Sequence, residues 1–279
     1  MASNEPTRDL VLEFLHLEQT TAVQLVLSYK AKLIEKGLKE ATVNRRLAAI
    51  KSLTAIGRQI GVCSYTLEDI TGEKLKPYRD TTGVDKEAFI RVLALAEQKR
   101  AVQTKRSRLK GIRDYALLRL LWGNALRRGE ISQTNINDFD AESQTLSIMG
   151  KGQGREKQII SLPPQSARAL SEWLIARGES DPDAPLFIAI DNANYGQRLS
   201  GNGIYTIVDR LCKKAGISKK MSPHRIRHSS ITAALDATDG NIRKVQKLSR
   251  HVNINTVMTY DDNRSNHQEE LSQLLDDLV

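Results

Sequence analysis

Apolar side chains recur at helical intervals through the first 75 residues of the chain. Residues 10–15 open one apolar stripe, and residues 23–33 continue the i, i+3, i+4 spacing until Gly37 marks a helix end. A further helix is expected from Thr42 onward. Its apolar positions are Val43, Leu47, Ile50, Leu53 and Ile56. These patterns predict a helical N-terminal region with one polar side on each helix.

The helical pattern stops between residues 71 and 84, where glycines, a proline and several cations replace it, and it resumes at Asp85. We expect the later helices at residues 86–97, 114–122, 166–177, 203–215, 224–235, 241–248, 254–260 and 266–278. Between the second and third of these, residues 145–149 and 157–162 form two short strands joined by a glycine-rich turn. The sequence therefore predicts a mainly α protein with a small antiparallel β-sheet.

The chain length allows more than one hydrophobic core. At 279 residues, two modest domains are expected by the usual scaling of domain size. We place a helical domain at residues 1–75, a linker at 76–84 and a second domain at 85–279.

The charge balance favours a polyanionic partner. Lys and Arg together number 42 against 33 Asp and Glu, which gives a net charge of +9. The candidates for contacts to DNA phosphates lie on the helix after Thr42 and near the linker, namely Arg45, Arg46, Lys51, Lys74, Lys76 and Arg79. A solvated helix face and an ordinary surface linker fit these positions equally well.

The cysteines and the N-terminal sequence indicate the cellular compartment of the protein. Cys63 and Cys212 are the two cysteines and form no C-x-x-C pair, which argues against a disulfide scaffold or a cysteine zinc site. The N-terminus lacks a signal-peptide pattern, and no apolar stretch is long enough to span a bilayer. We expect a cytoplasmic protein that does not bind membranes.

Residues suited to phosphoryl transfer follow one another in the second domain. They are Arg127, Lys151, His224, Arg227, His251 and Tyr260. Guanidinium groups match the non-bridging oxygens of a phosphodiester, which suits Arg127 and Arg227. His224 can accept the proton of a nucleophilic Tyr260, and Lys151 on the hairpin turn can protonate the leaving oxygen. Taken singly, each of these residues has a commoner structural role, but together they predict a phosphoryl-transfer site.

His224 and His228 lie four positions apart on one predicted helix, a spacing that also occurs in zinc sites. The glutamate of H-E-x-x-H is missing, and Arg225 and Arg227 stand between the histidines and would repel a divalent cation. We expect no metal ion and no cofactor.

These residues resemble the catalytic set of the tyrosine recombinase family, also called the phage integrase family. That set comprises two arginines, a hairpin lysine, a His-x-x-Arg pair, a second histidine or tryptophan, and a tyrosine. Here the pair is His224 to Arg227, and Tyr260 lies nine positions beyond His251, as the family pattern expects. In addition, residues 42–47 resemble the T-x-x-R-x-L helix of the family's core-binding domain.

The resemblance implies a SAM-like core-binding domain followed by a tyrosine-recombinase catalytic domain. It implies that Tyr260 attacks double-stranded DNA, forms a 3′-phosphotyrosyl link and frees a 5′-hydroxyl that attacks the partner strand. Two such exchanges pass through a Holliday junction within a homotetramer on two sites, in DNA integration, excision or resolution. The leucines of residues 266–278 would dock into a neighbouring protomer, although packing on their own domain fits their spacing equally well.

Two positions depart from the family pattern, because Ala125 and Arg250 stand where the family usually has glycine. Arg250 either contacts phosphate or projects to solvent. On the hairpin, Arg155 and Lys157 could compete with Lys151 for the role of the acid.

Two carboxylates are candidates for supporting the site. Glu130 and Asp138 could anchor Arg127 or its helix, while a routine surface role or a capping role is the alternative for each.

Three functions remain open at this stage. The first is a site-specific recombinase of the minimal two-domain Xer-like type, without a separate arm-binding domain. The second is a type IB topoisomerase, which uses similar chemistry to relax supercoils. The third is a catalytically silent DNA-binding accessory protein.

Overall fold

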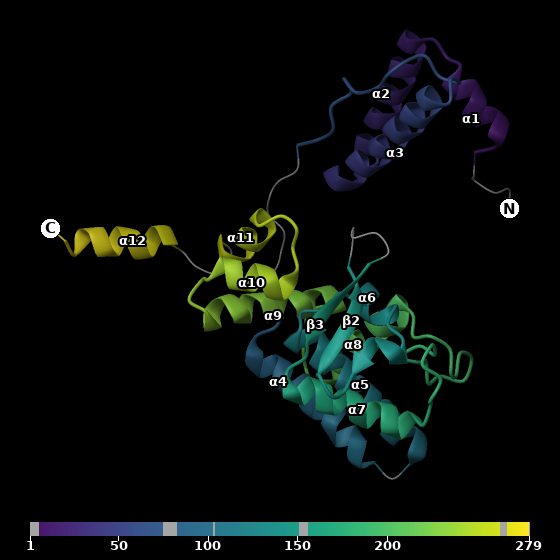
Figure 1. Cartoon of the computed structure of the whole chain (residues 1–279). Coiled ribbons are helices and arrows are strands. Elements are labelled where there is room, and N and C mark those ends of the chain that lie inside the picture. The colour runs from purple at the N-terminus through teal and green to yellow at the C-terminus, as the bar shows by residue number, and fades with distance from the viewer. Residues whose placement is uncertain (1–5, 75–82, 103, 151–155, 263–266, 279) are drawn as a thin grey trace. The chain divides into compact units, whose positions relative to one another are not determined.

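The chain folds into two compact units, Met1–Arg79 and Asp80–Val279. The computed structural model describes residues 6–74, 83–102, 104–150, 156–262 and 267–278 (Figure 1). Residues 75–82, which form most of the predicted linker, lie outside the described residues.

Three helices build the N-terminal unit: α1 (Arg8–Leu15), α2 (Gln19–Glu35) and α3 (Glu40–Gln59). Their apolar faces meet in one core, which the segment after α3 closes with Tyr65, Leu67 and Ile70. The Tyr65 hydroxyl donates to the Phe14 carbonyl at 2.6 Å, so this segment is tied back to α1. The unit therefore has its own core, as a separately packed domain requires.

The core of the second unit forms around α5 (Lys105–Gly123), which packs against α4 (Lys86–Gln98), α7 (Pro164–Arg177) and α9 (Pro223–Ala237) (Figure 1). The second half of α5 is almost wholly buried, which explains its continuous apolar run. The helix α8 (Gly201–Lys214) packs against α4 and the short α6 (Arg128–Ser132).

The sheet of this unit has three antiparallel strands in the order β1 (Phe139–Asp140), β2 (Thr145–Met149) and β3 (Lys157–Ser161). In β2 the side chains of Leu146 and Ile148 are buried, while their neighbours alternate toward solvent. The 3₁₀ turns η1 (Lys99–Ala101) and η2 (Ile136–Asp138) precede α5 and β1 respectively.

The chain ends in α10 (Ile242–Ser249), α11 (Asn255–Asp262) and α12 (His267–Asp276). The helices α9, α10 and α11 pack on one another and enclose a small core of Ala125, Ile231, Leu235, Val245, Val257 and Tyr260. This core connects the turn before α6 with the last helices of the domain.

The predicted fold class, mainly α with a small antiparallel sheet, is confirmed. Three details of the prediction were wrong. The core helix begins at Lys105 rather than at 114, because its basic first half hides the helical periodicity. Strand β1 was not expected, and Leu10 and Ile56 of the predicted apolar stripes are 57% and 52% exposed. Within the described residues, no helix is long and apolar enough to cross a membrane.

Candidate active site

Arg127 lies at the N-terminus of α6, directly after the turn that ends α5. Glu130, buried in the first turn of that helix, binds Arg127 through both of its carboxylate oxygens. One carboxylate oxygen accepts from Arg127 Nη1 at 2.6 Å, and the other accepts from the Arg127 backbone N–H at 2.8 Å. The Arg127 side chain keeps 27% of its surface exposed. Glu130 thus orients a guanidinium that still faces solvent.

Arg227, on the first turns of α9, is 1% exposed. Its guanidinium donates to the carbonyls of Ala125 and Ser249, which belong to segments more than 100 residues apart, and contacts His251 Nε2 at 3.3 Å. Burial, reinforced by repulsion from Arg127 and Arg250, lowers the pKa of Arg227 to about 9. The site therefore concentrates positive charge that an anionic phosphate would stabilise.

Ala125 and Arg250, the two positions where the family usually has glycine, both have left-handed backbones, with φ of 46° and 55°. Such a conformation costs a non-glycine residue about 1–2 kcal/mol. The glycine preference of the family at these positions therefore has a backbone reason, and in this chain the turns hold alanine and arginine under strain.

The Arg250 side chain does not project to solvent. It turns inward to 9% exposure and donates to Glu130 Oε2 at 3.1 Å and to nearby carbonyl groups. The alternative of a solvent-directed arginine was wrong, because a carboxylate and several carbonyls lie within its reach inside the protein.

His251 contacts both Arg227 and Tyr260. Arg227 can only donate, so His251 Nε2 accepts from it, and the ring proton lies on Nδ1 and is donated to Ser249 Oγ at 3.0 Å. Burial, then repulsion from Arg227 and Arg127, lowers the pKa of His251 to about 4. The imidazole is therefore neutral near pH 7 and held in one tautomer.

Tyr260, on α11, is 4% exposed and packs between two imidazoles. Its ring stacks on His251 with centroids 6.0 Å apart and meets His228 edge to face at 4.8 Å. Its phenol also raises the pKa of Arg227, in opposition to burial and to the neighbouring cations. Tyr260 thus lies beside His251, which in turn contacts Arg227 of the same domain.

His224 and His228 occupy successive turns of α9 and contact each other, with Nε2 to Nε2 at 2.7 Å. His224 is exposed, whereas His228 is 7% exposed and lies between His224 and Tyr260. Contacts therefore run without interruption from His224 through His228, Tyr260 and His251 to Arg227.

The hairpin turn that carries Lys151 lies outside the described residues, as does Arg155. Lys157 begins β3 and pairs with the buried Asp138 at 2.5 Å, and Asp138 also accepts from the Asn135 backbone. Lys157 is therefore engaged at the base of the hairpin, which weakens it as a competitor for the role of the acid. Asp138 is more than a cap, because it ties β3 to η2.

The predicted DNA-contacting residues differ in their exposure and in their contacts within the protein. Arg45 and Arg46 are exposed on α3, and Lys74 is exposed after it. Lys51 donates to the Glu68 carbonyl at 3.1 Å and, at 100° per residue, lies well away from Arg46 around the helix. The other two predicted residues, Lys76 and Arg79, lie outside the described residues.

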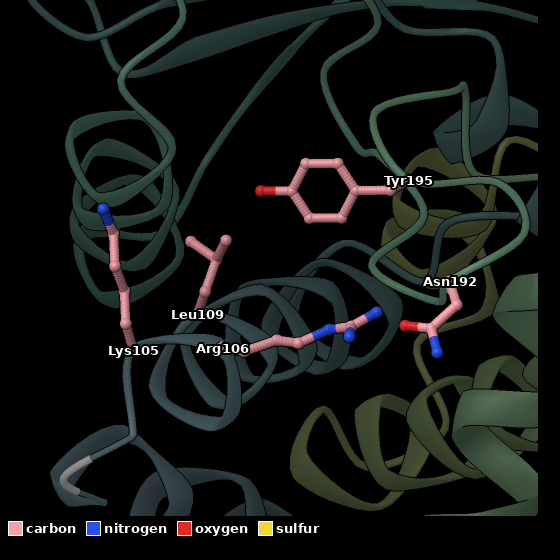
Figure 2. Close-up of a pocket in the computed structure, with 5 residues that line it drawn as sticks. All are labelled: Lys105, Arg106, Leu109, Asn192 and Tyr195. Atoms are coloured by element: carbon pink, nitrogen blue, oxygen red, sulfur yellow. The ribbon is translucent and has the colours of Figure 1, made fainter.

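Among the described residues of the second unit, at least two groups of side chains line open pockets. One, of about 330 Å³, borders the site and is lined by residues of β3 and of the end of α10, including Arg250 and His251. The other, of about 570 Å³, lies between the start of α5 and a loop that carries Asn192 and Tyr195, and shares no lining residue with the site (Figure 2). Its Arg106 donates to the Ile190 carbonyl at 3.1 Å. Of these two pockets, the first borders the cluster of arginines and histidines.

Among the described residues, no three His, Cys, Asp or Glu side chains are grouped so that they could hold a metal ion.

The sequence does not predict the contact of His228 with Tyr260, although the position of His228 one turn after His224 already places both histidines on one face of α9. Glu130 anchors Arg127 as expected, and the spacing of three between them is typical of a side chain that caps a helix start.

The chain is similar to known proteins in its sequence and in its fold. The sequence profile of the phage integrase family matches residues 91–267. A tyrosine recombinase of Synechocystis sp. is 48% identical over 279 residues, which is 100% of this chain and 86% of the relative. One from Synechococcus elongatus is 46% identical over 275 residues, covering 99% of this chain and 83% of the relative.

Solved structures share the fold at low sequence identity. The XerH recombinase in a pre-cleavage complex with its difH substrate aligns with a TM-score of 0.64 and 23% identity, over 92% of this chain and 69% of that one. A lambda integrase dimer bound to a core site aligns with a TM-score of 0.61 and 14% identity, over 95% of this chain and 75% of that one.

Proposed function

Since the chain belongs to the phage integrase family and is a tyrosine-type site-specific DNA recombinase, we propose that Tyr260 is its nucleophile and that Arg127, Lys151, His224, Arg227 and His251 complete its active site. The observation that carries this proposal is the unbroken set of contacts from His224 to Arg227 through the Tyr260 ring. The set brings a phenol, imidazoles and a guanidinium together within one domain.

The two arginines bind the scissile phosphate. Attack by a phenol adds negative charge to the non-bridging oxygens, and preorganised guanidinium donors stabilise that charge more in the transition state than in the ground state. Arg127 is oriented by Glu130 and partly exposed, so it contacts the phosphate from the solvent side. The buried Arg227 contacts the phosphate from the side of the protein interior. His251 holds Arg227 on one side and stacks on Tyr260 on the other.

The proton of Tyr260 passes to the histidine pair of α9. His224 is the acceptor in this proposal, and His228 lies between it and the tyrosine ring. Replacement of His224 by alanine should therefore change the pH dependence of cleavage as well as its rate.

Lys151 gives a proton to the 5′ oxygen as the phosphorus–oxygen bond breaks. Tyr260 becomes linked to the 3′ phosphate and the other strand end carries a free 5′-hydroxyl. Because the phosphodiester energy is kept in the phosphotyrosine, the reverse attack rejoins DNA without an external energy source. Attack by a 5′-hydroxyl from a second duplex exchanges strands, and two exchanges pass through a Holliday junction.

The substrate is double-stranded DNA, held by both units. Solved relatives of the same fold are complexes with their own DNA sites. On the N-terminal unit, the exposed Arg45, Arg46 and Lys74 are suited to phosphate contacts, and Lys51, Lys76 and Arg79 complete the proposed set.

A homotetramer on two sites performs the exchange. Leu274 and Leu275 of α12 and Leu278, just after this helix, are 57%, 62% and 73% exposed. Three exposed leucines so close together favour docking on a neighbouring protomer.

The test is a DNA substrate with a nick close to the cleavage point, which loses the short strand after attack and traps the covalent complex. The wild-type protein should form an adduct that resists denaturant, and Tyr260→Phe should form none while still binding the DNA. An adduct formed by Tyr260→Phe would refute the assignment.

A further inference from the structure

Arg250 connects the two halves of the active site. It follows α10 directly, between Ser249, whose carbonyl accepts from Arg227, and His251. Its side chain turns away from this segment and into the protein, with 9% of its surface exposed.

The guanidinium reaches three separate stretches of chain. Nη1 donates to the Asn124 carbonyl at 3.0 Å and to the Leu248 carbonyl at 2.7 Å. Nη2 donates to the Ala125 carbonyl at 3.3 Å and to Glu130 Oε2 at 3.1 Å. One side chain thus ties the end of α5, the first turn of α6 and the end of α10 together.

Two of these four acceptors also hold the catalytic arginines. Glu130 orients Arg127, and the Ala125 carbonyl also accepts from Arg227. In return, Arg127 Nη2 points to the Arg250 carbonyl at 3.4 Å. Burial lowers the pKa of Arg250, and the Glu130 carboxylate opposes that effect, so the buried charge is matched by a specific partner.

We propose that Arg250 is a positioning residue: it fixes the Arg127–Glu130 pair against the segment that carries His251 and Tyr260, without contacting the phosphate. The proposal rests on the assignment of Arg127 and Tyr260 to phosphate binding and attack. Preassembly of the phosphate site and the nucleophile raises the cleavage rate, because the groups need no reorganisation when the DNA is bound.

The geometry separates this role from direct phosphate binding. The four donor contacts of the two Nη atoms go to protein acceptors, all within hydrogen-bonding distance. Loss of Arg250 should therefore slow the bond-breaking step and leave the affinity for DNA nearly unchanged, whereas loss of a phosphate ligand would weaken both.

The experiment compares full-length Arg250→Gly, Arg250→Lys and the wild type on the trapping substrate at saturating DNA. Glycine suits the left-handed backbone at this position, where φ is 55°, so the variant loses the contacts without added backbone strain. Arg250→Gly should form the adduct at least tenfold more slowly, with DNA affinity within twofold of wild type. Arg250→Lys keeps the positive charge but lacks the forked donors of a guanidinium. Its rate of adduct formation should lie between those of Arg250→Gly and the wild type.

A double-mutant cycle with Glu130→Gln tests whether the two residues act together. The loss of rate caused by Glu130→Gln should be at least threefold smaller in Arg250→Gly than in the wild-type background. Arg177→Ala is the matched control, because Arg177 also donates to backbone carbonyls, those of Pro185 and Leu186, but at the end of α7. It should leave the cleavage rate unchanged even if it lowers the melting temperature.

An Arg250→Gly protein that cleaves within twofold of the wild type would overturn the proposal. So would a tenfold loss of DNA affinity with an unchanged rate at saturation, which would make Arg250 a phosphate ligand, or strictly additive effects in the cycle. If the wild type itself forms no adduct, the proposed function fails, and that result is distinguishable because it does not depend on residue 250.

Discussion

At the scale of single residues, the proposed catalytic set depends on burial and on the partners that burial allows. Arg227 and Tyr260 are 1% and 4% exposed, and each contacts His251. A buried guanidinium needs acceptors, which Ala125 and Ser249 provide from their backbones. The same burial lowers the pKa of His251 to about 4, so the free enzyme holds this imidazole neutral.

The low pKa of His251 predicts a pH dependence of stability. The unfolded chain binds a proton on this residue below about pH 6.5, whereas the folded chain does so only near pH 4. The stability that this group contributes is therefore complete above pH 6.5 and is lost as the pH falls toward 4. His251→Asn should lose less free energy of unfolding than the wild type between pH 6.5 and 4.

Urea unfolding at stepped pH measures this difference. Trp122 and Trp173, the two tryptophans of the chain, both lie in the second unit, so their fluorescence reports on the unit that contains His251. His16→Asn, which removes a histidine from the other unit, is the matched control. Identical pH slopes for His251→Asn and the wild type would contradict the assigned pKa.

At the scale of elements, the β2–β3 hairpin carries one of the proposed catalytic residues and one residue that anchors it. Lys157 pairs with Asp138 at the base of β3, whereas Lys151 belongs to the sequence between β2 and β3, outside the described residues. The two lysines should therefore respond differently to the chemistry of the leaving group.

A substrate with sulfur in place of the bridging 5′ oxygen tests this difference, because a thiol has a pKa near 8.5 and leaves without a proton. Lys151→Ala should slow cleavage of the oxygen substrate by about 10²-fold or more and cleave the sulfur substrate at nearly the wild-type rate. Lys157→Ala should slow both substrates to the same degree. If the sulfur substrate restores the cleavage rate of Lys157→Ala and not that of Lys151→Ala, then Lys157 is the acid and Lys151 is not.

The helix α12 should act in assembly rather than in DNA binding. Removal of residues 267–279 eliminates the exposed leucines and should abolish complexes of two DNA sites while single-site affinity changes by less than about twofold. Analytical ultracentrifugation with labelled DNA sites distinguishes complexes of two sites from complexes of a single site. Leu274→Ser with Leu275→Ser is the smaller change and should act in the same direction. Unchanged pairing of sites after the deletion would mean that α12 packs on its own domain.

Sequence patterns predicted most elements because burial follows helical and strand periodicity, as in β2 and α7. They failed at α5, whose first half is basic, and at β1, which has two residues and carries no periodicity. The side-chain direction of Arg250 could not be predicted, because it depends on a left-handed backbone and on acceptors more than 100 residues away. The catalytic spacing was recognisable because it belongs to a family pattern, while the contact of His228 with Tyr260 required the fold.

At the scale of the whole molecule, the proposed mechanism uses only groups of the DNA and of the protein. The charge in the site is supplied by Arg127, Arg227 and Arg250 against Glu130. Cleavage and strand exchange should therefore continue at the wild-type rate in excess chelator at constant ionic strength. A restriction endonuclease that needs Mg²⁺, added to the same tube, verifies that the chelator is effective, and strict dependence of cleavage on a divalent metal would contradict the mechanism.

The central claim is that one particular phenol carries the broken DNA strand. The chain has seven tyrosines, so the trapped wild-type adduct can be digested with protease and nuclease and the modified peptide sequenced by mass spectrometry. The account predicts a single nucleotide-bearing peptide, modified at Tyr260. Attachment to any other residue, or a cleaved substrate without a covalent peptide, would contradict it.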